Sequence, residues 1–173
     1  THLKYMNGEP KEYIIADVME DMMDIAKDKL KKKSIPFKSV FVKRNEPLPI
    51  DDSSIDVIVS FYSLEHLHPL ESYLKDMHRV LKPGGILIGA VPAEGGLGWG
   101  LGRFLTTRRW IKKNTTLNYD KIICWEHPNF GDTIFNEMDK LFTKVKLDFW
   151  PLTFLPSLDF NLVLSFKYIK SKD

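Results

Sequence analysis

The sequence contains very little cysteine, since Cys124 is the only one in 173 residues. A disulfide within the chain is therefore impossible, and a zinc site built on cysteines is excluded. His66, His68, His78 and His127 also lack the close spacing of a zinc site, so we expect no metal. A protein without structural disulfides suits a reducing compartment, and we expect a cytoplasmic location.

Long apolar stretches are absent as well. No uninterrupted apolar run is long enough to span a bilayer, and no apolar segment follows the basic residue near the start, as a signal peptide would require. The net charge of +2 does not by itself demand a polyanionic partner. With 43% hydrophobic and 28% charged residues, the composition is that of an ordinary globular domain with a core.

Hydrophobic periodicity predicts alternating strands and helices. Short apolar runs predict strands, and apolar residues at helical spacing predict helices. The last helix has Asp132 as its possible cap, and the final two strands suggest an antiparallel pair. This order indicates an α/β domain with a mostly parallel sheet. The expected strands are 12–16, 39–43, 55–61, 86–91, 144–150 and 161–169, and the expected helices are 20–33, 69–81 and 132–142.

Three segments occur in a characteristic order: YIIADVMEDMMDIAKDKL at 13–30, LPIDDSSIDVIVSFYSLEHL at 48–67, and HRVLKPGGILIGAVP at 78–92. Together they resemble the class I S-adenosylmethionine-dependent methyltransferases, in their small-molecule branch. The resemblance implies a Rossmann-like sheet, mostly parallel with an antiparallel C-terminal strand pair. It implies S-adenosyl-L-methionine as the cofactor and S-adenosylhomocysteine as the product.

The same resemblance places two family features before Thr1. These are the first strand of the sheet and the glycine-rich loop after it, so we expect this sequence to lack both. We interpret 1–173 as one methyltransferase domain. Its cofactor-binding part is 1–93, its variable substrate or lid region is 94–142, and its C-terminal strand pair is 143–173.

The resemblance assigns the first cofactor contacts to the end of strand 12–16. The Asp17 carboxylate can accept two hydrogen bonds from ribose hydroxyls, although it could instead cap the next helix. Val18 and Met19 would lie near the adenine. Asn45 follows Arg44 where the family usually has an acidic residue, and its side-chain oxygen could replace that acid. Arg44 cannot accept a hydrogen bond, and a solvated loop is the alternative for this pair.

A second set of contacts is expected after strand 55–61. Ligands of open α/β sheets bind beyond the carboxyl ends of the strands. The resemblance implies that the backbone of Ser60, Phe61 and Tyr62 contacts the methionine part of the cofactor. Tyr62 could also reach the methyl acceptor.

Three further side chains are candidates for acid–base chemistry. His66 could act as a general base or could make a structural hydrogen bond at a turn. Glu126 and His127 could form an acid–base pair in the variable region. Methyl transfer is an in-line displacement, so positioning alone could supply most of the acceleration.

Acidic residues are absent from Gly95 to Tyr119, where five cations alternate with aromatic and aliphatic residues. The stretch 97–113 could form an amphipathic helix that binds an anionic acceptor or a membrane surface, or a lid with solvated charges. No nucleic-acid-binding module is present, and no nucleic acid partner is expected. The sequence leaves the oligomeric state open.

The sequence therefore predicts an enzyme that methylates a small-molecule or glycan-like acceptor. Two alternatives come from other classes. One is a non-catalytic fragment or binding module that retains the fold. The other is a nicotinamide-dependent oxidoreductase, which also places an acid after its second strand.

Overall fold

The structure is a computed structural model that describes residues 10–43 and 46–172. The chain divides into two compact units, Thr1–Pro49 and Ile50–Asp173, and each is described by itself. Within the described residues, no helix has both the length and the apolar composition needed to cross a membrane.

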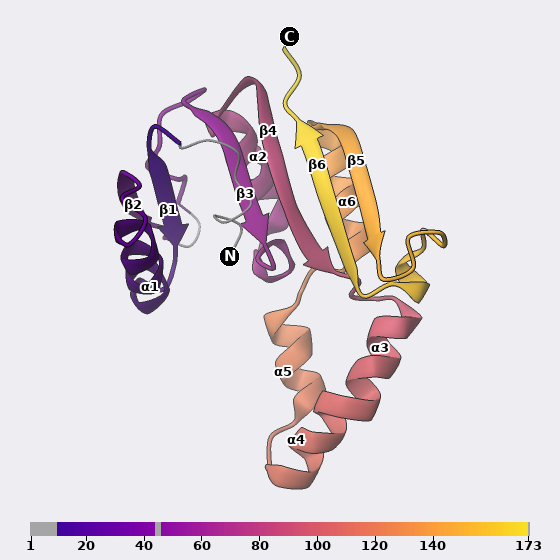
Figure 1. The fold of residues 1–173 in the computed structure, drawn as a ribbon. Coiled ribbons are helices and arrows are strands. Elements are labelled where there is room, and N and C mark those ends of the chain that lie inside the picture. The colour runs from indigo at the N-terminus through magenta and orange to yellow at the C-terminus, as the bar shows by residue number, and fades with distance from the viewer. Residues whose placement is uncertain (1–9, 44–45, 173) are drawn as a thin grey trace. The chain divides into compact units, whose positions relative to one another are not determined.

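The first unit is a small β-α-β motif. Strand β1 (Tyr13–Asp17) leads into helix α1 (Glu20–Lys31), and strand β2 (Phe37–Phe41) returns parallel to β1 (Figure 1). Acidic residues in the first turn of α1 and lysines in its last turn complement the helix dipole. A small core holds the unit together, made by Ile15, Met23 and Leu30.

The second unit is built on a four-stranded sheet in the order β3-β4-β6-β5. Strands β3 and β4 are parallel, whereas β6 is antiparallel to both β4 and β5. The predicted antiparallel C-terminal pair is therefore confirmed. The strands are β3 (Ile55–Phe61), β4 (Leu81–Pro92), β5 (Thr143–Trp150) and β6 (Val163–Ile169).

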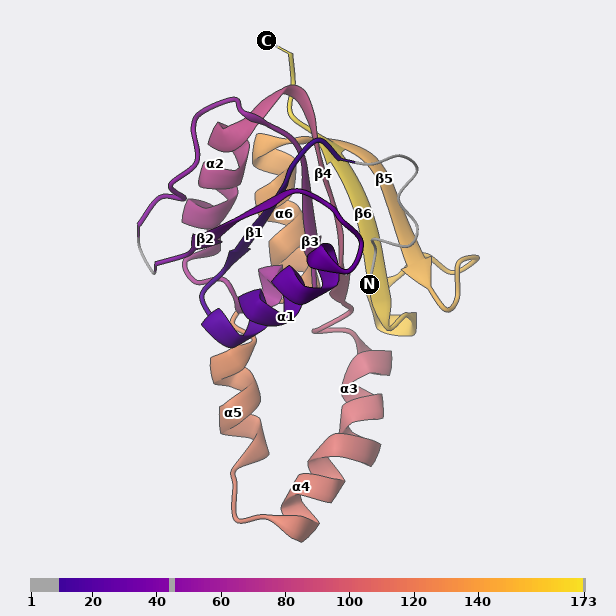
Figure 2. The ribbon, with the colours of Figure 1, turned by 60° about the vertical axis from the view of Figure 1, so that its left-hand side comes forward.

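Two helices cover one face of this sheet, as Figures 1 and 2 show. They are α2 (Leu70–Val80) and α6 (Gly131–Leu141), which also pack against each other. Alternate residues of β4 and β6 face them, so the sheet and both helices share one apolar core. The fully buried members of this core include Leu74, Leu87, Met138, Leu164 and Tyr168.

A helical arm leaves the sheet beyond the carboxyl end of β4 (Figure 1). We use this name for residues 97–126, in which two helical segments fold back on each other. The first runs without interruption through α3 (Leu97–Arg103), the π-helix η3 (Phe104–Arg108) and α4 (Arg109–Asn114). The second is α5 (Tyr119–Glu126), which leads back towards α6.

Two short 3-10 helices complete the second unit. They are η2 (Leu64–His66), directly after β3, and η4 (Leu158–Phe160), before β6. The backbone of η4 packs against α3, and a Cβ added at Gly96 would lie 2.2 Å from the Leu158 carbonyl oxygen. The start of the arm is therefore fixed against the sheet through a position at which only glycine fits.

Several predicted boundaries need correction. Helix α6 begins at Gly131 with Phe130 as its N-cap, so Asp132 lies in the first turn and does not cap the helix. Strand β2 begins at Phe37, two residues before the predicted start, because Phe37 pairs with Tyr13 of β1. Helix α5 was not predicted from the sequence.

Candidate functional site

The first candidate residues lie at the end of β1. Asp17 is partly buried, and its Oδ1 accepts a hydrogen bond of 2.9 Å from the backbone N–H of Met19. Met19 itself is the N-cap of α1, so Asp17 is not the capping residue. The bond orients the carboxylate, and Oδ2 accepts no hydrogen bond from residues 10–43 or 46–172. Oδ2 can therefore take a ligand hydroxyl.

Apolar side chains surround this carboxylate at the surface. Val18 is 46% exposed and Met19 is 52% exposed, which suits contact with a flat aromatic ligand. Their contact with adenine stays a prediction. Asn45 and the preceding Arg44 lie outside the described residues.

The second group lies at the end of β3. The Ser60 side chain is buried and shares a hydrogen bond of 2.7 Å with Ser63 Oγ. Phe61 and Tyr62 are both about half exposed. Tyr62 adopts a φ of 53°, and its N–H donates to the carbonyl oxygen of Ala90 at 2.9 Å. A left-handed conformation is uncommon for a tyrosine, and the bond to β4 holds this turn in place.

His66 follows directly, at the end of η2. Its Nδ1 lies 2.7 Å from the backbone carbonyl oxygen of Glu126. A carbonyl oxygen only accepts, so Nδ1 carries the proton and the neutral ring leaves Nε2 as an acceptor. The buried Asn129 side chain fixes this turn, since its Nδ2 donates to Leu64 O at 2.9 Å and to Leu67 O at 2.6 Å.

Glu94 anchors the second histidine. Its side chain is 4% exposed, one oxygen contacts His127 Nδ1, and the other accepts a hydrogen bond from Arg103 Nη1. Because a carboxylate accepts, His127 also carries its proton on Nδ1 and leaves Nε2 unprotonated when neutral. Arg103 Nε donates in addition to the Tyr119 hydroxyl at 2.7 Å. The network joins the end of β4 to both segments of the arm.

The two imidazoles contact each other edge to face. Their centroids are 4.5 Å apart, with an angle of 82° between the ring planes. Burial lowers the pKa of His127, and the charge of a protonated His66 lowers it further. The charges of Glu65 and Glu126 raise this pKa and that of Arg103 lowers it, so the pKa stays below its ordinary value. His127 is therefore neutral near pH 7 and able to accept a proton.

A second buried carboxyl lies beside this pair. Burial raises the pKa of Glu65, and among the described residues its Oε2 has no hydrogen-bond partner. Its Oε1 lies 3.9 Å from His66 Nε2. Glu65 therefore brings to the same cluster a carboxyl group whose own protonated form is favoured by burial. No group of three or more residues among those described could hold a metal ion.

The predicted pairing of Glu126 with His127 needs correction. Glu126 is exposed, and it contributes its backbone carbonyl to His66 rather than its carboxylate to His127. The carboxylate that contacts His127 belongs to Glu94, which sequence reasoning missed. One signal was available, because Glu94 is the last acid before a stretch with five cations and no acid. A direct catalytic role of Glu126 stays a prediction.

Comparison with known proteins identifies the family. Residues 1–89 match the family described as methyltransferase domain, which is half of the chain. The chain belongs to this family. As a class I S-adenosylmethionine-dependent methyltransferase by descent, it has the α/β fold expected from its three motifs. Membership favours methyl transfer over the nicotinamide-dependent oxidoreductase that the sequence left open.

The chain is also similar to individual methyltransferases. A ubiquinone/menaquinone biosynthesis C-methyltransferase, UbiE of Yersinia pestis, is 39% identical over 82 residues, covering 47% of this chain and 33% of that protein. The match thus spans about a third of the curated relative. The N-methyltransferase NodS of Bradyrhizobium japonicum, solved with S-adenosylhomocysteine, is 18% identical, with a TM-score of 0.55 over 92% of this chain and 67% of that one.

A third relative is not named as a methyltransferase. The cyclase SpnF is 13% identical, with a TM-score of 0.63 over 92% of this chain and 66% of that one. Likeness at this level of identity shows the fold alone. The fold therefore determines neither the acceptor nor the reaction, and both depend on the residues of the site.

Proposed function

We propose that this chain belongs to an enzyme that transfers a methyl group from S-adenosylmethionine to a small-molecule acceptor with an ionisable nucleophile. One observation carries the proposal. The rings of His66, which ends η2, and His127, which follows α5, contact each other. The Nδ1 of His66 is held by a carbonyl oxygen and that of His127 by a carboxylate oxygen. This arrangement leaves two ring nitrogens that can take a proton from an acceptor.

The residues at the two strand ends fit the cofactor by chemical type. When bound, S-adenosylmethionine supplies an electrophilic methyl group on a positively charged sulfur. Asp17 would hold the ribose through its oriented carboxylate, beside the exposed apolar side chains of Val18 and Met19. Ser60, whose side chain is already bonded to Ser63, would offer its backbone to the amino-acid part.

His127 is the better candidate for the base. It is neutral near pH 7 because burial lowers its pKa, whereas a protonated imidazole could not accept a proton. Glu94 keeps its Nδ1 protonated and its Nε2 unprotonated, as the acidic partner of a catalytic histidine does. His66 limits the motion of the ring from one side.

The site supports a broad class of methyl acceptors. A small-molecule, anionic or glycan-like acceptor suits a site bordered by Arg103 and two histidines. The name of the UbiE relative makes hydroquinones the first compounds to test, since loss of a hydroxyl proton activates such rings for methylation. Because the match covers only 33% of UbiE, other acceptors should be tested as well.

A binding module without methyl transfer is the second candidate. The observation in its favour is the fold shared with the cyclase SpnF, whose name describes another reaction. The two functions are distinguished by turnover. A binding module would release no S-adenosylhomocysteine with any acceptor, whether or not it binds S-adenosylmethionine.

Asp17→Ala is expected to weaken S-adenosylhomocysteine binding by about 1–3 kcal/mol, a factor of roughly 5 to 150. The loss follows because ribose hydroxyls would no longer have a charged acceptor. Isothermal titration calorimetry measures it, on the chain and on the longest polypeptide that its gene encodes. Asp21→Ala removes the same charge from an exposed position of α1 and should leave the affinity unchanged.

Two results would count against the proposal. Failure of both polypeptides to bind S-adenosylhomocysteine would overturn it entirely. Equal affinity of wild type and a folded Asp17→Ala variant would remove only the ribose assignment.

A further inference from the structure

The helical arm has an inner side whose charges are neutralised within the protein. Arg103 bonds to Glu94, and Arg108 Nη2 donates to Asp120 Oδ2 at 2.7 Å across to α5. Within the first segment, the Arg108 guanidinium also lies 5.3 Å from the centre of the Phe104 ring. The Arg108–Asp120 pair joins the two segments of the arm, and both arginines have their ionic partners within the protein.

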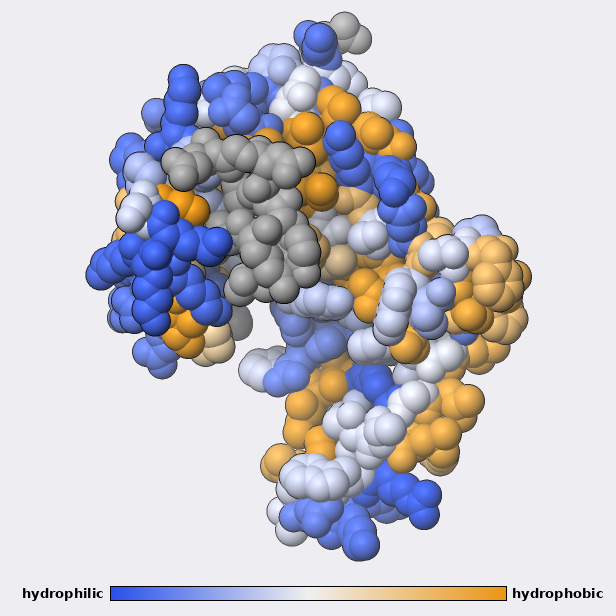
Figure 3. Space-filling view, in the orientation of Figure 1, coloured by the Kyte–Doolittle hydropathy of each residue, from blue (hydrophilic) through white to orange (hydrophobic). Residues whose placement is uncertain are grey.

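The outer side of the arm carries apolar side chains that the fold leaves in solvent. Leu97 is 72% exposed and Leu101 is 59% exposed, and Leu105, which follows at the same spacing, is 54% exposed. Positions i, i+4 and i+8 form one stripe along a helix. Trp110, at 63% exposure, lies further along the same helix. Figure 3 shows the resulting hydrophobic surface along the arm.

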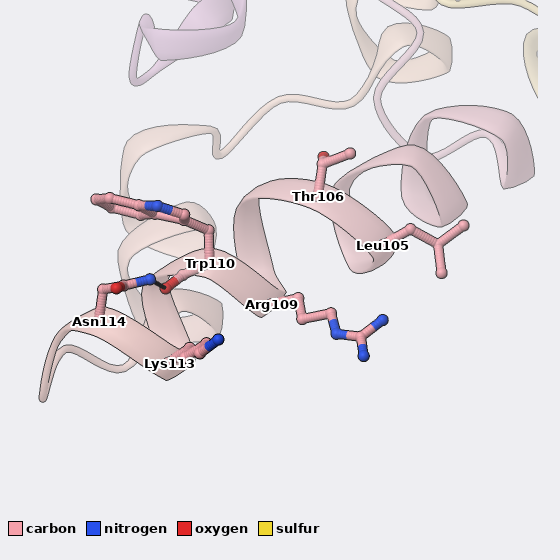
Figure 4. Close-up of a pocket in the computed structure, with 6 residues that line it drawn as sticks. All are labelled: Leu105, Thr106, Arg109, Trp110, Lys113 and Asn114. Carbon is pink, nitrogen blue, oxygen red and sulfur yellow. Dashed lines mark hydrogen bonds between the residues drawn. The ribbon is translucent and has the colours of Figure 1, made fainter.

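Positive charge without an internal partner continues this surface. Arg109, Lys112 and Lys113 are exposed and form no salt bridge with any residue in the described parts of the chain. Leu105, Arg109 and Lys113 follow one another one turn apart (Figure 4). With Thr106, Trp110 and Asn114 they line a shallow pocket that combines apolar, cationic and amide groups.

We propose that the outer side of the arm docks onto the surface of a membrane that contains anionic phospholipids. An interfacial helix buries its apolar stripe among the lipid chains while its cations meet the headgroups. The arm has both parts, and the pocket beside Arg109 and Lys113 suits a phosphate headgroup. The inference is independent of the proposed methyl transfer.

The observations favour a lipid surface over a soluble anion. A soluble anion would use the cations but would leave Leu97, Leu101 and Leu105 in water. The lack of any acidic residue from 95 to 119 removes repulsion from an anionic surface over the full length of the helix. A surface that is apolar and cationic together fits a bilayer interface.

Cosedimentation of the full chain with lipid vesicles tests the proposal. We expect strong binding to vesicles of phosphatidylcholine mixed with phosphatidylglycerol, and weak binding to phosphatidylcholine alone. The triple substitution Arg109→Gln, Lys112→Gln and Lys113→Gln should reduce the partition coefficient about 100-fold, since each cation contributes about fivefold. Leu101→Ser with Leu105→Ser should reduce binding to both kinds of vesicle.

The matched control, called the α1 variant, is a triple substitution in the last turn of α1 and directly after the helix, namely Lys29→Gln, Lys32→Gln and Lys33→Gln. These lysines are exposed, in no salt bridge among the described residues, and carry the same total charge. The control should bind vesicles as wild type does. Circular dichroism establishes that every variant is folded before it is compared.

Three outcomes would overturn the proposal. The first is equal binding of wild type to the two kinds of vesicle, and the second is an equal loss in the arm and α1 variants. The third is full release of the protein by millimolar glycerol 1-phosphate, which would show a site for soluble phosphates instead. Each readout is independent of S-adenosylmethionine, so failure of the methyl transfer proposal would leave it unaffected.

Discussion

Gly89→Ala is expected to lower the free energy of unfolding by about 3 kcal/mol. Gly89 pairs with Ser60 near the carboxyl end of the parallel contact between β3 and β4. A Cβ added there would lie 1.7 Å from the Ser60 carbonyl oxygen and 2.9 Å from the Phe166 ring. The closest of these atoms belongs to the backbone, so the clash can be relieved only if the two strands move apart. Urea denaturation followed by circular dichroism measures the change.

Gly100→Ala is the matched control, because a Cβ at Gly100 would meet nothing within 4 Å. Alanine favours a helix over glycine by about 1 kcal/mol, so this variant should be as stable as wild type or slightly more stable. If both variants unfold at the same urea concentration as wild type, β3 and β4 do not approach each other as closely at Gly89 as the structure shows. This result would also bear on function, since Ser60 is one of the residues proposed to contact the cofactor.

Glu94→Ala is expected to destabilise the protein by about 3 kcal/mol and to release the base of the helical arm. The substitution removes the carboxylate from a buried pair and leaves Arg103, only 17% exposed, without its counter-charge. It also breaks the contact that connects β4 with His127. Hydrogen exchange should show a loss of protection in 97–126 but not in α2 or α6. Unchanged protection in the arm would contradict the prediction.

The same carboxylate is expected to affect methyl transfer through the orientation of His127. Glu94→Gln and His127→Gln should each reduce turnover about 100-fold, measured by release of S-adenosylhomocysteine with a hydroquinone or another accepted substrate. In wild type, turnover should fall as the pH falls through the pKa of His127, which lies below the ordinary 6.5. Protonation removes the lone pair, so acid lowers activity, and His127→Gln should lack this acidic limb.

Glu126→Gln distinguishes orientation by Glu94 from a general effect of nearby charge. Glu126 neighbours His127 in sequence but does not contact its ring nitrogens with its carboxylate. It should retain wild-type turnover near pH 7. Its acidic limb should shift slightly to lower pH, because the charge of Glu126 raises the pKa of His127. A loss equal to that of Glu94→Gln would restore the pairing that the sequence suggested.

The sequence predicts best those elements whose pattern is decided locally. Strand β3 was predicted at its observed bounds, because IDVIVSF is a nearly continuous apolar run. Helix α1 begins at Glu20 as predicted, since acids mark its first turn, but it ends at Lys31 and not at residue 33. Strand β2 was misplaced by two residues, because pairing with β1 rather than local composition sets its register.

The sequence locates candidate site residues only where a single strand end supplies them, and their contacts with the cofactor stay a prediction. Asp17 and Ser60 follow apolar runs, so their positions can be read from the sequence. Glu94 could not be paired in advance, since its partners lie 9 and 33 residues away and meet it only through the arm. Helix α5 was missed because it buries no residue completely and gives a weak periodic signal.

The most direct test of the central claim is an NMR titration of the isotopically labelled protein with S-adenosylhomocysteine. We predict saturable chemical-shift changes at the amides of Val18 and Met19 at the end of β1 and at those of Phe61 and Tyr62 at the end of β3. The amides of α4 should not change. Absence of shifts at either strand end would contradict the cofactor contacts proposed for the residues of that end.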